Sequence, residues 1–203
     1  MTVSLNGALI AVAADFCGKY APYQAVQVRP NPHGGVFVAA TDAGRIAFLG
    51  FDPAGKGDEE IILLPSADLL KNTRPLKSAA RWIEIEGNMA RCSKMMKTTS
   101  QTVEVPITRS TSEPADLIGA MKAVAQRWGK DCPVVSCGNF NGNFLLRAFK
   151  AIEQLGGSIT MSALDGGPLR VESTDGSAIV LVMPEMAREV PPLPDYLHQF
   201  VVS

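Results

Sequence analysis

The pattern of apolar and polar positions predicts many short strands and a few helices. Alternating or continuous apolar runs predict strands at residues 2–5, 25–29, 36–40, 45–50, 60–64, 81–86, 90–96, 102–107, 132–136, 158–164, 169–173 and 178–183. Apolar residues at helical spacing predict helices within 7–20, 66–78, 114–131 and 141–154. Successive strands joined by short turns favour antiparallel sheets, so the order of the elements predicts an α+β fold.

The order "helix, strands, helix, three strands" occurs twice along the chain. It fills residues 1–110 and recurs in a shortened form in residues 113–186. The segment between them, residues 108–114, is polar and poor in apolar side chains, which is typical of a linker. We therefore expect two domains, each with two helices packed on antiparallel sheet, and the second domain is abbreviated. Residues 187–203 form a tail that is rich in proline at its start and expected to be extended there.

The clearest local motif is a β-hairpin. Two apolar strands, 36–40 and 45–50, flank the turn Thr41-Asp42-Ala43-Gly44. Asp and Gly in such a tetrapeptide supply the local hydrogen bonds and the positive φ that a tight reversal needs. Asp42 is therefore interpreted as a turn residue that accepts backbone hydrogen bonds.

The chemistry of the chain favours a binding protein over an enzyme. Its two histidines, His33 and His198, lie in a Pro/Gly turn and in the tail, away from any clustered nucleophile. The segment 52–57 lacks the first glycine and the Ser/Thr of a phosphate loop. The carboxylate run 58–60 has no histidine nearby, which favours a solvated loop over a metal site. We expect no catalysis, metal or cofactor, and a small-molecule enzyme on an unrelated α+β fold is the competing hypothesis.

Composition and cysteine usage fit a globular cytoplasmic protein. The chain has 203 residues, of which 46% are hydrophobic and 19% charged. It has no apolar run of the roughly 18 residues that span a bilayer, and its N-terminus lacks the basic head of a signal peptide. The four cysteines match no zinc motif and are expected to be reduced thiols: Cys17, Cys92, Cys132 and Cys137.

Charge is divided between helices and strands. The four predicted helical segments carry nine basic and five acidic residues, while the rest of the chain carries ten basic and fifteen acidic residues. Cationic helices could face a polyanion while the acidic remainder keeps the protein soluble. The alternative is that Lys and Arg are simply good helix formers, so the division is supporting information only.

Two stretches resemble bacterial sliding clamps, the processivity factors of DNA replication. The hairpin resembles the clamp motif A-T-D-G-x-R-L-A, and residues 168–172 with 178–184 resemble the last two strands of the family. The matches occur in the family's order and correspond to the second and third of three domains. The resemblance implies a DNA-binding protein without catalysis. In this family, helices of six domains line a ring through which duplex DNA passes without sequence-specific contact.

The resemblance also implies two sets of functional residues. Basic helix residues would contact DNA phosphates: Lys71, Arg74, Lys77, Lys122, Arg147 and Lys150. For each of them, a solvated helix face is the alternative. A hydrophobic pocket for short peptide motifs of DNA polymerases or repair proteins would include Thr41, Arg45, Leu181 and Met183. Leu181 and Met183 could equally belong to the core.

The chain also departs from the family. Gly44 replaces the usual histidine before the hairpin arginine, and between Trp128 and Asn141 there is room for one strand where clamps have several. Three two-domain chains could close a homotrimeric ring. The other hypothesis is a monomeric or dimeric relative, of phage or mobile-element origin, that survives as a peptide-binding adaptor without encircling DNA. The tail could then cover a sheet edge or fill a pocket with Tyr196, Leu197 and Phe200.

Overall fold

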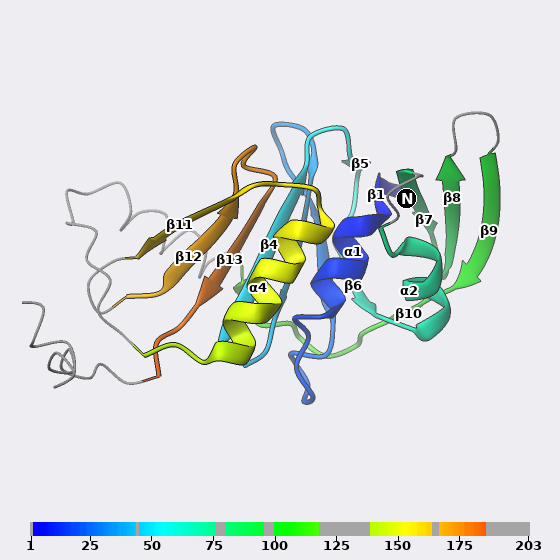
Figure 1. Cartoon of the computed structure of the whole chain (residues 1–203). Coiled ribbons are helices and arrows are strands. Elements are labelled where there is room, and N and C mark those ends of the chain that lie inside the picture. Colours follow the sequence, from blue (N-terminus) through cyan, green and yellow to red (C-terminus); the bar gives the residue numbers. More distant parts are fainter. Residues whose placement is uncertain are drawn as a thin grey trace, which may run out of the picture.

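Two antiparallel sheets carry a row of helices on one side (Figure 1). The computed structural model describes residues 2–43, 45–75, 80–95, 100–117, 139–163 and 167–185. The α+β class predicted from the element order is confirmed. The expected strand 132–136, most of the predicted helix 114–131 and the tail 187–203 lie outside the described residues.

The smaller sheet has five strands in the order β5-β1-β7-β8-β9. They are β1 (Thr2–Asn6), β5 (Lys56–Gly57), β7 (Ala80–Glu86), β8 (Met89–Met95) and β9 (Ser100–Pro106). The predicted meander β7-β8-β9 is confirmed. Strand β1 joins it antiparallel, with Leu5 opposite Ile83. Both of these side chains are fully buried, so this face of the sheet belongs to the core.

The larger sheet has eight strands in the order β10-β6-β2-β3-β4-β13-β12-β11. They are β2 (Val26–Pro30), β3 (Val36–Thr41), β4 (Ile46–Asp52), β6 (Ile61–Leu64), β10 (Thr108–Arg109), β11 (Ile159–Ala163), β12 (Leu169–Ser173) and β13 (Ala178–Val182). Strand β13 pairs with β4, so strands from both halves of the sequence share one sheet. Sequence periodicity does not reveal this non-local pairing.

The start of the predicted linker is part of this sheet. Thr108 pairs with Leu64, and the guanidinium group of Arg109 bonds the Glu59 carboxylate at 2.9 Å and the Gly87 carbonyl. Strand β10 has only two residues, which is too short for an apolar pattern to predict it. The ion pair with Glu59 and the hydrogen bond to the Gly87 carbonyl hold it in the sheet instead.

Each described helix has a side-chain N-cap. Helices α1 (Gly7–Ala14), α2 (Ala67–Thr73) and α4 (Gly142–Gln154) are capped by Asn6, Ser66 and Asn141. Asparagine and serine are favoured at this position because the side-chain oxygen accepts a free backbone N–H, but α1 and α2 end earlier than the predicted segments. Helix α1 ends at Ala14, so Lys19 is not helical. Helix α2 ends because Pro75 pushes the preceding residue, Arg74, into an extended conformation with ψ 136°.

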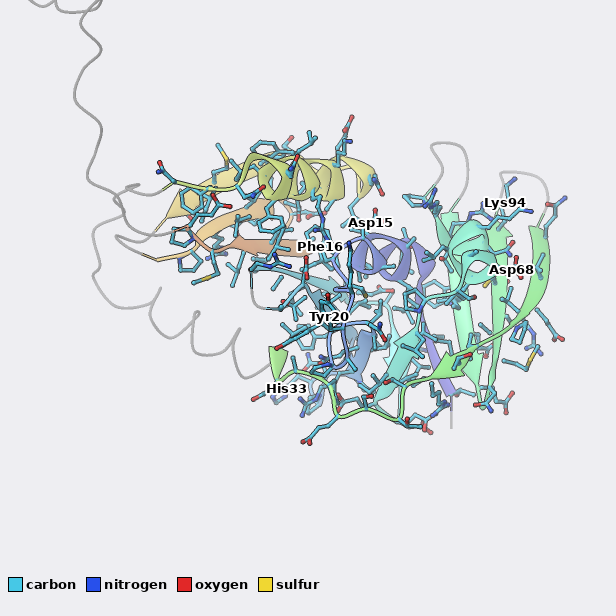
Figure 2. All side chains as sticks on the ribbon, turned by 90° about the horizontal axis from the view of Figure 1, so that it is seen from below. Asp15, Phe16, Tyr20, His33, Asp68 and Lys94 are labelled. Atoms are coloured by element: carbon cyan, nitrogen blue, oxygen red, sulfur yellow. The ribbon has the colours of Figure 1, made fainter. Side chains whose placement is uncertain are left out.

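Helix α1 is the centre of the core. All residues from Gly7 to Ala13 are buried, and the helix contacts β2, β3 and β4 of one sheet and β7 of the other. Phe16 follows it, fully buried, and its ring stacks on Phe48 at 5.4 Å between centroids. Helix α2 covers β7, β8 and β9, and α4 covers β11, β12 and β13. The three helices therefore lie along one side of the strands, as Figure 2 shows from below.

Candidate functional site

The turn between β3 and β4 lies beside the end of β13. Ile46 pairs with Val182 and Ala47 pairs with Leu181 across the β4–β13 ladder. One step further, the Met183 N–H donates to the Arg45 carbonyl at 3.2 Å. The structure thus brings the hairpin and the last strand together, as the resemblance implies.

The four residues expected in a pocket differ in exposure. Thr41 and Leu181 are 3% and 7% exposed, and the Thr41 hydroxyl donates to the Ile46 carbonyl at 2.7 Å. By contrast, the Arg45 side chain is 63% exposed and Met183 is 43% exposed. Thr41 and Leu181 therefore support the surface from inside, while Arg45 and Met183 are accessible to a partner.

The turn is closed by backbone hydrogen bonds. Asp42 donates its N–H to the Ile46 carbonyl, and its carbonyl accepts the N–H of Arg45 at 3.0 Å. Ala43 has a positive φ of 51°, an uncommon conformation for a residue with a Cβ. Gly44, where the sequence suggested a positive φ, lies outside the described residues. The backbone of Asp42 therefore has the expected turn role.

The carboxylate of Asp42 has a second role. Its Oδ1 bonds Arg45 at 3.1 Å, and its Oδ2 lies 3.9 Å from Arg147 of α4. Both guanidinium groups also approach the Phe144 ring, at 5.8 and 5.9 Å from its centroid. The turn is therefore attached to α4 by one anion, two cations and one aromatic ring.

Arg147 also joins α4 to the end of α1. Its guanidinium group donates to the Asp15 carbonyl and lies over the Phe16 ring at 5.3 Å. The side chain is 30% exposed. Sequence reasoning missed this structural role, although Phe144 and Arg147 at i, i+3 share a helix face and were a usable signal.

The chain leaving β13 is tied to the start of α4. The Glu185 N–H donates to the Asn139 carbonyl at 2.7 Å, and the Asn141 side-chain amide donates to the Glu185 carboxylate at 2.7 Å. Asn141 also caps α4 by accepting the Asn143 N–H. Met183 is thus anchored on both sides, by Arg45 before it and by Glu185 after it.

The residues expected to contact DNA are distributed unevenly. Lys71, Arg74 and Lys150 are exposed, whereas Lys77 and Lys122 lie outside the described residues. Within the observed bounds of α1, α2 and α4, the charged residues are Lys71, Arg147, Lys150, Asp68 and Glu153. With three basic residues against two acidic ones, the described helices α1, α2 and α4 together carry a net charge of +1.

A hollow of about 320 Å³ lies between the end of α1 and α4. It is lined by Asp15, Phe16, Arg147, Lys150, Ala151 and Gln154. Figure 2 shows Asp15 and Phe16 at this end of α1, facing α4. The hollow therefore places two cationic side chains beside one exposed carboxylate on the helix side of the molecule.

The remaining candidate chemistry is structural. Glu59 pairs with Arg109, Glu60 lies 3.8 Å from Arg29, and Asp58 accepts the Thr2 N–H at 3.0 Å. The Arg109 hydrogen bond holds the pKa of Glu59 below its usual value. Across the described ranges, no three His, Cys, Asp or Glu side chains are grouped to hold a metal ion. Of the helices in the same ranges, none is long and apolar enough to cross a bilayer.

The fold is that of bacterial DNA sliding clamps. The chain is similar to the DNA polymerase sliding clamp of Pseudomonas aeruginosa, with a TM-score of 0.59 and 12% identity over 92% of this chain and 66% of that one. The DNA polymerase beta subunit of Streptococcus pyogenes gives a TM-score of 0.58 and 12% identity over 89% of this chain and 64% of that one. DNA polymerase III subunit beta of Borrelia burgdorferi, in complex with a natural product, gives a TM-score of 0.57 and 8% identity over 92% of this chain and 64% of that one.

These similarities are structural only. No protein-family model matches the sequence. No curated protein matches it either. The chain spans about two thirds of the length of the clamps it resembles, which is consistent with a shortened version of the fold.

Proposed function

We propose that this chain is a non-catalytic, clamp-type processivity factor. It tethers DNA polymerase or repair proteins through short peptide segments and contacts duplex DNA without sequence preference. The observation that carries the proposal is the junction of the β3–β4 turn with the end of β13, where Arg45 and Met183 are adjacent and exposed. The shared fold with the solved clamps supports the same function.

The peptide site would use Met183 as its apolar contact. A methionine side chain is flexible and polarizable, so it can adapt to different partners. Thr41 and Leu181 fix the backbone beneath it, which limits the ordering cost when a peptide binds.

Peptide selection tests this site. Short random peptides displayed on phage are selected on the immobilised protein, and the affinity of the enriched sequences is measured with Met183→Lys. Met89→Lys is the matched control, because Met89 is also 43% exposed but lies on β8. We expect Met183→Lys to weaken binding by about tenfold or more, because it places a charge in an apolar contact. Equal binding by the two variants, or no enrichment, contradicts the proposed site.

The DNA contact would use the exposed cations of the helix side. Lys71 and Arg74 on and after α2, and Lys150 beside the hollow on α4, can approach phosphates from helices that lie on one side of the molecule. Lys77 and Lys122 remain part of this proposed set. Arg147 would contribute mainly by holding α4 against α1, since Asp15, Phe16 and Asp42 already contact it.

Titration of a fluorescent duplex tests the DNA contact. Binding by the wild type should be independent of sequence and should weaken steeply as salt rises. The double variant Lys71→Glu/Lys150→Glu should weaken it further and reduce the salt slope by about two, one for each lost phosphate contact. Lys56→Glu, on the short strand β5, is the control and should bind like the wild type.

The second candidate function is a peptide-binding adaptor that does not encircle DNA. The involvement of Arg147 in internal contacts favours it, because this cation is then less available to a phosphate. The same titration separates the two functions. A wild-type protein that binds peptide but shows no salt-dependent binding to duplex DNA is an adaptor.

The clamp function also needs a closed assembly. With two domains, at residues 1–110 and 113–186, three copies would supply the six domains of a ring. The chain's length, about two thirds that of the solved clamps, is compatible with this arithmetic. Light scattering should then give a trimer, and the trimer should stay on nicked circular DNA and leave it when the circle is cut. A monomer or dimer contradicts the ring.

A further inference from the structure

We propose that Arg45 selects partner segments in which a carboxylate accompanies the apolar residues, so that the candidate site binds acidic–apolar peptides. This inference rests on the proposed peptide-binding function and names the chemistry of the partner. Four observations carry it: the fixed backbone of Arg45, the exposure of its guanidinium group, the local charge, and the position of Met183.

The backbone of Arg45 is fixed on both sides. Its N–H donates to the Asp42 carbonyl at 3.0 Å, and its carbonyl accepts the Met183 N–H at 3.2 Å. The first bond closes the turn, and the second joins the turn to the end of β13. The side chain therefore projects from a defined point, which lowers the entropy cost of using it in recognition.

The guanidinium group of Arg45 is held in place but has further hydrogen-bond donors beyond the one bonded to Asp42. It makes one hydrogen bond, to Asp42 Oδ1, and lies over the Phe144 ring. A guanidinium group has five N–H donors in a planar fork, and this side chain is 63% exposed. The fork matches the two oxygens of a carboxylate, so a bound carboxylate can form a bidentate, charge-assisted pair.

Charge at the turn also favours an additional anion. The single carboxylate of Asp42 lies between two cations, Arg45 at 3.1 Å and Arg147 at 3.9 Å. Lys150 adds a third cation on the same helix as Arg147, the exposed Asp15 lies with both around the hollow, and the exposed carboxylate of Glu185, two residues after Met183, is bonded by the Asn141 amide. A partner carboxylate on Arg45 would leave Asp42 to Arg147, so both cations at the turn would have an anionic partner.

Met183 sets the pattern of the partner. It is exposed and adjacent to Arg45 through the backbone bond, so one peptide can place an apolar side chain on the thioether and a carboxylate on the guanidinium group. A neutral peptide that covers Arg45 would desolvate the charge without replacing its water, which penalises it relative to an acidic one. Selectivity would therefore come both from the attraction between Arg45 and a peptide carboxylate and from the desolvation cost that a neutral peptide incurs on Arg45.

A cycle that combines acid and amide forms of one peptide with variants of Arg45 tests the inference. The tightest peptide enriched on the wild-type protein is remade with its acidic residues changed to the corresponding amides. Both peptides are titrated by calorimetry into the wild type, Arg45→Gln, Arg45→Lys and Arg91→Gln. The control Arg91 is 53% exposed and also pairs with carboxylates, but it lies on β8 of the smaller sheet.

We expect the amide peptide to bind the wild type about tenfold more weakly, as for loss of a charge-assisted pair. Arg45→Gln should bind both peptides equally, about as weakly as the wild type binds the amide peptide. Arg45→Lys should bind the acid peptide with intermediate affinity, because lysine keeps the charge but lacks the planar fork of donors. Arg91→Gln should behave as the wild type. Unchanged melting temperatures establish that each variant is folded.

The failures can be told apart. Enriched peptides without acidic residues, or acid and amide peptides that bind the wild type alike, overturn the role of Arg45 while binding that depends on Met183 survives. An acid–amide difference that persists in Arg45→Gln also overturns it, because another group then reads the charge. If no peptide is enriched, or if binding ignores Met183, the proposed function fails and the inference falls with it.

Discussion

Helices α1 and α4 have the same kind of N-cap but occupy very different surroundings. Each is capped by an asparagine, Asn6 or Asn141, and each covers strands of the eight-stranded sheet. Helix α1 is buried from Gly7 to Ala13 and contacts both sheets. Helix α4 buries three residues, Ala148, Ala151 and Ile152, and exposes a polar face.

The difference in burial distinguishes a helix that only stabilises the core from a helix that also presents a surface. A helix that is apolar all round can only be part of a core, whereas an amphipathic helix keeps one face for contacts with solvent or a partner. The candidate site, the hollow and the Asp42 contacts all involve α4. Arg147 is the exception on α4, because it reaches the end of α1 and so belongs to the packing between the two helices.

The largest expected effect is a core deletion in α1. Ile10→Ala removes a fully buried side chain and should lower the free energy of unfolding by about 2–5 kcal/mol. Leu146→Ala on α4 removes a side chain that is 50% exposed and should change it by no more than about 0.5 kcal/mol. Urea titrations followed by circular dichroism measure both. Equal losses would show that the two helices are not as different as their burial indicates.

A smaller effect is expected at the contact between the helices. Arg147→Ala removes the hydrogen bond to the Asp15 carbonyl and the contact with the Phe16 ring, which should cost about 1–2 kcal/mol. Lys150→Ala, one turn further along α4 and exposed, should stay within about 0.5 kcal/mol of the wild type. The same urea titration decides. If both variants are neutral, Arg147 is an ordinary surface residue.

The two caps give a still smaller and more selective effect. Asn6→Ala and Asn141→Ala should each cost about 1 kcal/mol, the usual value for a lost N-cap. Only Asn141→Ala should also weaken peptide binding, because Asn141 bonds Glu185 and so helps to hold Met183. Peptide affinity that falls equally in both variants would contradict this link between α4 and the end of β13.

The smallest effect at neutral pH is expected at Cys17, just after α1. Burial raises the pKa of this thiol from 9.0 to about 12, and nearby Arg147 lowers it by a smaller amount. The folded state favours the protonated thiol, so its contribution to stability is fully present below pH 9 and is lost as pH rises towards 12. Cys17→Ala should therefore flatten the decline in stability above pH 9, as measured by urea titration at several pH values. An unchanged decline would contradict the raised pKa of this half-buried thiol.

Local motifs could be predicted from residue patterns, whereas long-range packing was indicated only by the resemblance, which placed the hairpin beside the strand at residues 178–183. The turn that begins at Thr41 is encoded in a few adjacent residues, and it was predicted. Helix α1 was predicted too long because the apolar pattern continues through the buried Phe16 after the helix has ended. Periodicity could not show that β13 joins β4, because it records which face is apolar and not which strand is the neighbour.

The resemblance named the residues of the candidate site but did not indicate how exposed each of them is. The resemblance named Thr41, Arg45, Leu181 and Met183, and the structure brings them together. It did not show that only Arg45 and Met183 are accessible, since exposure depends on strands far apart in the sequence. Arg147 was assigned by helix position alone, and its ring and carbonyl contacts require the three-dimensional arrangement.

The pairing of β4 with β13 has a consequence for synthesis. A ribosome completes the hairpin of β3 and β4 long before it makes β13. The edge of β4 that pairs with β13 therefore stays unpaired with it while the residues between them are synthesised. Nascent and prematurely terminated chains would carry the hairpin without Met183 beside it. The exposed pair of Arg45 and Met183 therefore exists only in chains whose translation has passed β13.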